Sequence, residues 1–153
     1  MTDPSFRRAE AADLSAIVAL LADDVLGATR EHLAEPLPPG YGAAFAAIDG
    51  DANQLLLVGE SAGRIVGCLQ LCFLPGLTHR GAWRAQIEAV RIAATMRDRG
   101  FGEAMILHAI GLAKERGCRI VQLTTDKARP DALRFYLRLG FAASHEGLKL
   151  ALS

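Results

Sequence analysis

The sequence predicts an α/β (α+β) fold in three layers, with helices on both sides of a mixed central sheet. Amphipathic helical patterns alternate with short aliphatic runs, and glycines and prolines mark the boundaries between them. Of the 153 residues, 51% are hydrophobic and 22% are charged, which is typical of a packed globular protein rather than a disordered or fibrous one. A chain of this length buries roughly two thirds of its unfolded surface, so we predict one domain over residues 1–153.

The first half of the chain is expected to supply two helices and an antiparallel meander. Apolar residues at i, i+3, i+4 and i+7 predict a helix over 13–21. The prolines and glycine at 36–40 mark a loop before a second helix over 41–48. The expected strands of this half are 6–9, then 54–60 and 64–74 joined by a turn with Gly63, and 83–92.

The second half is expected to form a β-α-β crossover and then one more helix and strand. Apolar residues cover most of a helix over 102–116, and Gly117 ends it. A buried strand over 119–124 follows, and Pro130 and Gly140 bracket the next helix. The predicted final strand covers 141–152, which gives the overall order β-α-α-β-β-β-α-β-α-β.

The charge balance argues against a nucleic-acid partner. Lys plus Arg and Asp plus Glu are equal at 17 each, so no broad cationic surface is expected to face phosphates. The first twenty residues carry several charges, unlike a signal peptide, and no apolar run is long enough to span a membrane. We therefore expect a cytoplasmic protein without a membrane partner.

The cysteines and histidines do not indicate a metal site. Cys68, Cys72 and Cys118 lie within apolar strand-like segments without ligand spacing, so we expect buried, reduced thiols. The four histidines are scattered along the chain, and we expect surface or structural roles for them.

The run Arg97-Asp98-Arg99-Gly100-Phe101-Gly102 is the most informative motif of the chain. It follows the strand expected at 83–92 and opens a long helix. A helix N-terminus leaves backbone N–H groups unpaired and carries partial positive charge, and glycines there let an anion approach the backbone closely. The motif therefore predicts a pyrophosphate site, although a plain glycine turn would produce the same pattern.

This basic-x-x-Gly-x-Gly spacing resembles the acetyl-coenzyme A motif of the GNAT superfamily of N-acetyltransferases. A second motif, with Ala132, Tyr136, Gly140 and Phe141 spaced as Ala-x-x-x-Tyr-x-x-x-Gly-Phe, is similar to the strand-helix unit of that superfamily. The two motifs stand in the right order, and the similarity extends over roughly residues 5–152. The resemblance implies the GNAT fold and acetyl-coenzyme A as co-substrate, with no metal.

The resemblance also implies which residues bind the cofactor. Backbone amides of the 97–102 run hold the pyrophosphate, and the strand backbone at Val90 and Ile92 pairs with the pantetheine arm. Many relatives have Asn seven residues before the tyrosine; this chain has Arg129, which either reaches cofactor or acceptor or is a solvated loop charge. The implied cofactor-binding residues are Val90, Arg91, Ile92, Arg97, Asp98, Arg99, Gly100, Phe101, Gly102, Arg129 and Phe135.

Glu88 and Tyr136 are the candidate catalytic residues. An attacking amine must lose a proton, and a carboxylate at Glu88 could accept it directly or through water. A salt bridge from Glu88 to Arg84 or Arg91 is the structural alternative. Tyr136 could protonate the departing thiolate of coenzyme A, or it could be an aromatic core residue.

The sequence thus indicates an acetyltransferase that passes acetyl directly to a primary amine of a small molecule or peptide. A covalent cysteine intermediate is disfavoured, since no cysteine has a histidine partner. The alternatives are a non-catalytic coenzyme A-binding sensor or interaction module, and an acyltransferase for longer acyl groups. The sequence does not identify the acceptor amine, and association as a homodimer is common among similar proteins.

Overall fold

The structure is a computed structural model that describes residues 3–153. Contacts divide the chain into two compact units, one ending at Gln122 and the other running from Leu123 to Ser153. The first unit holds nearly the whole sheet and most of the helices, and the second holds one helix and the C-terminal segment.

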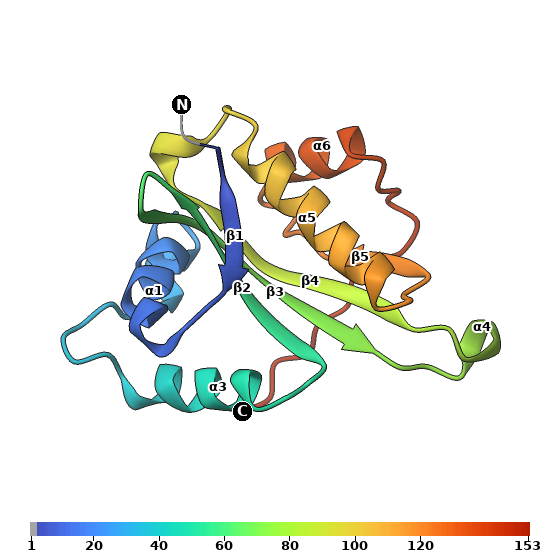
Figure 1. Cartoon of the computed structure of the whole chain (residues 1–153), viewed down its shortest axis with the longest axis horizontal. Helices are drawn as coiled ribbons and strands as arrows, with labels where there is room; N and C mark the ends of the chain where they lie inside the picture. The colour runs from blue at the N-terminus through green and yellow to red at the C-terminus, as the bar shows by residue number, and fades with distance from the viewer. Residues whose placement is uncertain (1–2) are drawn as a thin grey trace. The chain divides into compact units, whose positions relative to one another are not determined.

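The sheet has five strands in the order β1-β2-β3-β4-β5. Its first three pairings are antiparallel, as the meander pattern predicts. The chain then crosses over through a helix and returns beside β4, which confirms the mixed α/β class (Figure 1). The strands are β1 Ser5–Arg8, β2 Gln54–Ser61, β3 Arg64–Leu74, β4 Arg84–Ile92 and β5 Ile120–Leu123.

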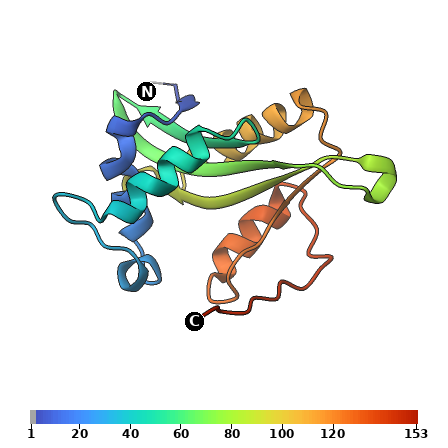
Figure 2. The same cartoon turned by 90° about the horizontal axis from the view of Figure 1, so that it is seen from below.

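Helices cover both faces of the sheet in the first unit. The helices α1 (Leu14–Ala22) and α3 (Pro39–Asp49) lie on one face, and α5 (Phe101–Glu115) lies on the other (Figures 1 and 2). The helix α3 begins two residues earlier than expected because Pro39 fits the first helical turn. The second unit holds α6 (Pro130–Arg138). The short elements that the sequence did not indicate are η1 Ala11–Asp13, α2 Gly27–Arg30, α4 Thr78–Gly81 and η2 Ala94–Met96.

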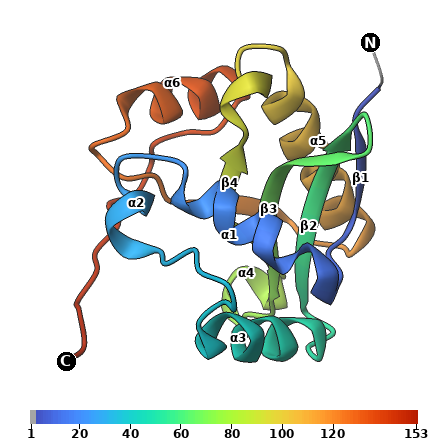
Figure 3. The ribbon, with the colours of Figure 1, turned by 90° about the vertical axis from the view of Figure 1, so that its left-hand side faces the viewer.

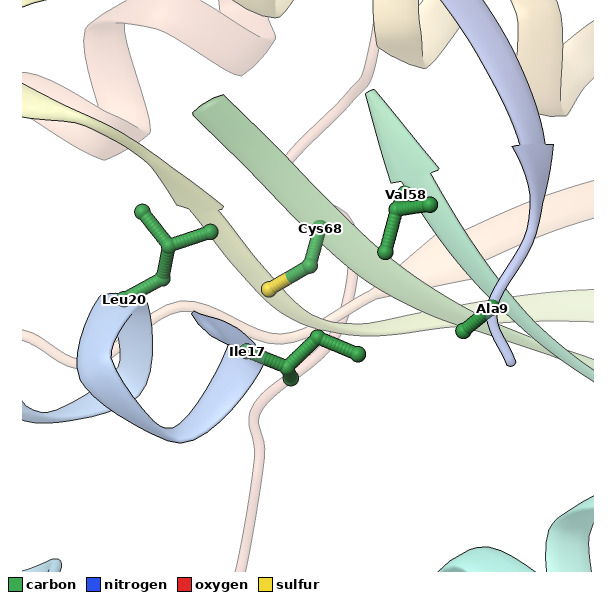
Figure 4. Close-up of a cluster of buried hydrophobic side chains, with 5 residues drawn as sticks. All are labelled: Ala9, Ile17, Leu20, Val58 and Cys68. Carbon is green, nitrogen blue, oxygen red and sulfur yellow. The ribbon is translucent and has the colours of Figure 1, made fainter. Parts of the chain in front are cut away.

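Alternate residues of the strands build a core on each side of the sheet. On the α5 side, Leu57, Leu69 and Ile87 are buried, as are Met105 and Ile106 of the helix. On the α1 side, a cluster joins strand, helix and loop residues, and Figure 4 shows its side chains converging. The members of that cluster are Ala9, Ile17, Leu20, Val58 and Cys68.

The N-terminus of α5 is anchored to the sheet by Phe101, which is only 4% exposed. Gly59 and Gly67 are directly opposite each other on β2 and β3, and a Cβ on either would lie within 3.0 Å of the Phe101 ring. The Phe6 ring meets Phe101 edge-on, with centroids 5.7 Å apart. The two glycines therefore leave the space that the Phe101 ring fills, and this contact fixes where α5 begins.

The prediction of a final strand over 141–152 is wrong for this chain. No helix or strand is assigned after α6 in the described residues. A strand is defined by pairing with a neighbour, and periodicity alone does not supply one. The fold class is confirmed, whereas its last element is not formed.

An ion-pair network joins β1, η1 and β2. The Arg7 guanidinium contacts Asp13 at 2.7 Å and Glu60 at 2.8 Å, and the Glu10 backbone N–H donates to Asp13 at 2.7 Å. Asp13 is 8% exposed. The Arg7 hydrogen bonds lower the pKa of Asp13 below its ordinary value of 3.8, and this outweighs the opposing effect of burial.

Asp13→Asn is expected to destabilise the protein by about 1–3 kcal/mol at neutral pH, because it removes the charged partner of a buried network. A carboxyl with a lowered folded pKa stabilises the fold above its unfolded pKa, and this contribution disappears as pH falls through the folded pKa. Urea unfolding should therefore show a variant deficit at pH 7 that shrinks towards pH 3. Asp49→Asn, which removes an exposed pair with Arg8, is the control and should change stability little. Equal losses of unfolding free energy in both variants at pH 7 would contradict a stabilising role for the Asp13 carboxylate.

Candidate active site

The N-terminus of α5 presents an open backbone cradle. Gly100 is the N-cap with φ +79°, and Asp98 has φ +60°. The first helical hydrogen bond runs from the Ala104 N–H to the Gly100 carbonyl, so the amides before Ala104 have no acceptor within the helix, and no side chain caps them at the N-cap. A Cβ at Gly100 would meet nothing within 4 Å. The loop is therefore not filled by its own side chains there, and an anion can approach the backbone.

Arg97, Asp98 and Arg99 are exposed beside this cradle. The Arg97 Nε donates to the Ile92 carbonyl at 3.1 Å, which ties the loop to the end of β4. The Arg91 side chain likewise donates to the Val90 carbonyl at 2.8 Å. A carbonyl oxygen has two lone pairs, so each of these strand carbonyls retains one acceptor position.

A β-bulge interrupts β4 next to Glu88. Gln70 pairs with Glu88 and Cys68 pairs with Arg91, so Leu69 is opposite two residues, Ala89 and Val90. Ala89 has φ +54°, a left-handed conformation that a residue with a Cβ rarely adopts. Such bulges release backbone groups from the strand ladder and are common next to active sites.

Glu88 is exposed on the face of the sheet that carries α1 and α3. Its carboxylate accepts a hydrogen bond from Gln86 Nε2 at 2.8 Å, and the Gln86 oxygen accepts one from Gln122 Nε2 at 2.8 Å. These two hydrogen bonds link Gln122 on β5 through Gln86 to Glu88 on β4, and they orient the Glu88 carboxylate. The salt-bridge alternative to Arg91 does not describe this arrangement, since the Arg91 guanidinium lies 3.2 Å from Asp24.

The Asp24–Arg91 pair connects the loop after α1 to β4. Both side chains are largely buried, at 15% and 17% exposed. The Gly27 N–H also donates to the Asp24 carboxylate, so the same carboxylate holds the start of α2. The backbone around α2 is therefore fixed to the strand that carries the bulge.

An apolar cavity of about 180 Å³ opens between α1, α3 and the sheet. Its sheet side includes Gln70, Cys68 and the bulged Ala89, and none of its lining residues is charged. The remaining lining residues are Leu14, Ile17, Val18, Leu21, Tyr41, Ala44, Phe45, Ile48 and Leu56. The cavity thus reaches the bulge one residue from Glu88.

The cysteines are free, as expected: Cys68 and Cys72 are buried and Cys118 is half-buried. Burial raises the pKa of Cys68 to about 12, and burial together with the Glu88 carboxylate raises the pKa of Cys72. Burial also raises the pKa of Cys118. All three thiols are therefore protonated near neutral pH, which makes each a poor nucleophile.

In the second unit, Tyr136 lies on α6 and is 9% exposed. Its ring meets those of Phe135 and Phe141 edge-on, at centroid distances of 5.1 and 5.7 Å. Arg129 precedes the first turn of α6, and its backbone N–H donates to the Asp126 carbonyl. Tyr136 therefore packs against two aromatic rings of its own unit.

Sequence reasoning missed several residues that shape this site. Asp24, Gln70, Gln86 and Gln122 were not singled out, nor was the bulge at Ala89. A usable signal was present for Gln86, because Gln86 and Glu88 alternate with buried apolar residues along one strand. The bulge and the partner of Arg91 depend on register and chain path, which one strand's sequence does not specify.

Over residues 3–153, no three or more His, Cys, Asp or Glu side chains gather as a metal-binding group. The helices in that same part of the chain are all too short or too polar to cross a bilayer.

The structure combines an open, helix-covered mixed sheet with a glycine cradle at a helix N-terminus, and this is the three-layer α/β arrangement of the GNAT fold. The model of the acetyltransferase (GNAT) family matches residues 17–141. The chain belongs to the GNAT family, and its curated relatives include N-acetyltransferases.

Individual relatives span the chain to different extents. A glucosamine 6-phosphate N-acetyltransferase of Trypanosoma brucei brucei is 29% identical, over 99% of this chain and 98% of its own. An aminoalkylphosphonate N-acetyltransferase of Salmonella typhimurium is 32% identical over 54% of this chain and 53% of its own. The crystal structure of a transcriptional regulator from Bacillus halodurans C-125 is 51% identical, covers 98% of this chain and 100% of its own, and has a TM-score of 0.95.

Proposed function

We propose that this protein transfers acetyl from acetyl-coenzyme A directly to a primary amine. The single observation that carries the proposal is the open cradle at Gly100, on a chain that belongs to the GNAT family. Main-chain N–H groups at the start of α5 bind the pyrophosphate, and the exposed Arg97 and Arg99 add positive charge beside it. The backbone of Val90 and Ile92 pairs with the pantetheine arm as an added strand would.

Glu88 serves as the general base in this proposal. The amine must be neutral to attack, and near neutral pH a primary amine is mostly protonated. The carboxylate, oriented by Gln86, takes the proton directly or through one water. The amine nitrogen then forms a bond to the thioester carbonyl carbon, and the negative charge moves to the carbonyl oxygen.

Collapse of that intermediate breaks the carbon–sulfur bond and restores the carbonyl. The departing sulfur needs a proton, and we propose that the Tyr136 hydroxyl supplies it, while the extra proton on the former amine nitrogen leaves through water and restores the hydroxyl. No covalent enzyme intermediate is required, which agrees with the protonated state of the three buried or half-buried thiols.

The apolar cavity beside Ala89 is proposed to hold the carbon skeleton of the acceptor. Because none of its lining residues is charged, it offers no cation for a phosphate or phosphonate group. We therefore expect an acceptor whose amine is attached to an uncharged, largely apolar body. This differs from the acceptors that name the trypanosomal and Salmonella relatives.

Tyr136→Phe is expected to lower kcat by about 10²-fold, because the proton donor to sulfur is lost. The aromatic packing with Phe135 and Phe141 is retained, so the fold and acetyl-coenzyme A affinity should change little. Steady-state kinetics together with calorimetric titration of acetyl-coenzyme A measures both quantities. An unchanged kcat would remove the proton-donor role from Tyr136.

The function is tested by measuring coenzyme A release against a panel of amines. Phenethylamine represents an apolar amine, whereas glucosamine 6-phosphate and 2-aminoethylphosphonate represent phosphorylated and phosphonate amines. Release with phenethylamine but not with the anionic amines supports both the activity and the cavity assignment. Release with the anionic amines alone keeps the activity and rejects the cavity assignment. Acetyl-coenzyme A binding without release on any amine would favour the non-catalytic module.

A further inference from the structure

The Gln70 side chain places an amide in the apolar cavity between α1, α3 and the sheet. It comes from β3, and α1 packs over β3 and β4 on this face of the sheet (Figure 3). Gln70 is half-buried and lines the cavity together with Cys68 and the bulged Ala89. The other lining side chains are apolar, apart from the Tyr41 hydroxyl. Gln70 therefore supplies the one amide side chain among the described residues that line this cavity.

Two neighbouring side chains fix the orientation of this amide. Gln70 Nε2 donates to Gln54 Oε1 at 3.0 Å and lies 3.8 Å from Cys72 Sγ, so both of its N–H groups have a partner. The Cys72 thiol donates to the same Gln54 oxygen at 3.0 Å. Burial and the Glu88 carboxylate raise the pKa of Cys72, so the thiol keeps the proton that it donates. The Gln54 oxygen thus holds the nitrogen end of the Gln70 amide, and the oxygen end is left for the cavity.

The Gln70 oxygen is an acceptor that the fold leaves unused. Within residues 3–153, Oε1 of Gln70 accepts no hydrogen bond from another residue. An amide oxygen has two lone pairs, and an acceptor that loses water without gaining a donor costs free energy. A molecule that fills this cavity must therefore bring a donor to Gln70 Oε1 or lose that free energy on binding.

A second acceptor lies beside the first, on the neighbouring strand. Gln70 and Glu88 are directly opposite in the register of β3 and β4. Side chains in such a pair share one face of the sheet, with Cβ atoms about 4.5–5.5 Å apart, so one small group can contact both. Glu88 has no N–H to donate, and the N–H groups of Gln70 already have partners. The pair therefore suits a cation with several N–H groups and disfavours a carboxylate or phosphate.

We propose that Gln70 Oε1 binds the substrate ammonium beside Glu88 and thereby selects acceptors that carry a primary amine. The inference rests on the proposed acetyl transfer and adds the group that holds the amine in the cavity. A primary ammonium has three N–H groups, so one donates to Glu88 while another donates to Gln70. Glu88 takes the first proton, and the N–H on Gln70 keeps the neutral amine in place. Gln70 neither gives nor takes a proton.

Gln70→Met tests the role of the oxygen, because methionine keeps the length of the side chain and removes the acceptor. Calorimetric titration of phenethylamine into protein saturated with coenzyme A measures binding without turnover. Phenethylamine should bind the variant about tenfold or more weakly than the native protein, since a hydrogen bond to a charged group is lost. Equal binding of phenethylamine to both proteins, or no binding to the native protein, would overturn the proposal.

Propylbenzene is the matched probe, because a methyl group replaces the amine and leaves no N–H to donate. It should bind Gln70→Met at least as tightly as it binds the native protein. Equal loss of affinity for both probes would mean that the substitution had changed the shape of the cavity, and this would overturn the role of the oxygen. Gln70→Glu restores an acceptor, and Gln54 can turn its amide to donate to the new carboxylate. Phenethylamine affinity in that variant should stay within about threefold of the native value, and a loss as large as in Gln70→Met would also overturn the proposal.

The failure of this inference can be told apart from the failure of the proposed function. Phenethylamine that binds with the expected dependence on Gln70, but is not acetylated, supports the amine site and removes the acetyl transfer. Coenzyme A release with the same KM for phenethylamine in the native protein and Gln70→Met supports the transfer and overturns the role of Gln70. If both proposals hold, Gln70→Met raises KM for the amine about tenfold or more and leaves the affinity for acetyl-coenzyme A unchanged.

Discussion

Replacing Glu88 by Gln is expected to lower kcat by about 10²–10⁴-fold, because the amide cannot accept the proton that the substrate ammonium must lose before its nitrogen attacks. Glutamine keeps the size of the side chain and its place beside Gln86 and the bulge at Ala89. Acetyl-coenzyme A affinity should therefore stay near that of the native protein. Steady-state kinetics with the best amine of the panel measures the first quantity, and calorimetric titration measures the second.

The loss of kcat in Glu88→Gln should become smaller as pH rises. As pH rises towards the pKa of the amine, more of the acceptor is already neutral and the base is needed less. The rate ratio between native protein and variant should therefore shrink at high pH. Glu115→Gln, at the exposed far end of α5, is the matched control and should leave kcat unchanged. A ratio that stays constant across the pH range would reject Glu88 as the base.

The second large effect is expected from Gly59→Ala. The added Cβ would lie 2.8 Å from two carbons of the buried Phe101 ring, which cannot move freely because Phe6 and the sheet surround it. Overpacking of this kind typically costs about 1–3 kcal/mol. Because Phe101 fixes the start of α5, the displaced ring should also weaken acetyl-coenzyme A binding. Thermal unfolding and calorimetric titration test the two consequences together.

Gly111→Ala is the control for that substitution. Gly111 lies within α5, and a Cβ there would meet nothing within 4 Å. Alanine is the better helix former by about 1 kcal/mol, so this variant should be as stable as the native protein or more stable. Equal destabilisation by both substitutions would mean that the packing of Phe101 against Gly59 does not position α5.

The sequence could predict the elements that are specified by the pattern of residues close together in the chain. The helix at 14–22 and the meander strands follow from side-chain periodicity, and their observed ends agree with the expected ones within one or two residues. The open glycine cradle at the start of α5 was also predictable, since the strand, glycines and helix that build it are contiguous in the chain, and its role in binding phosphate stays a prediction.

Features that depend on pairing between distant segments could not be predicted in the same way. The bulge at Ala89 arises from the register of β4 on β3, and the Asp24–Arg91 pair depends on where the loop after α1 returns to the sheet. The segment 141–152 has the periodicity of a strand, yet periodicity does not say which backbone will pair with it. Its prediction as a strand of this chain was wrong for that reason.

The measurement that tests the central claim most directly is calorimetric titration of acetyl-coenzyme A into three proteins: native, Gly100→Ala and Gly63→Ala. Both glycines have left-handed backbone, with φ +79° and +75°, and open space where a Cβ would stand. Alanine should therefore cost both variants a similar backbone strain of about 1–2 kcal/mol. If the pyrophosphate lies on the amides at the start of α5, only Gly100→Ala loses affinity, by about tenfold or more, which corresponds to about 1.4 kcal/mol. Equal affinity in all three proteins, or no binding by the native protein, would contradict the account.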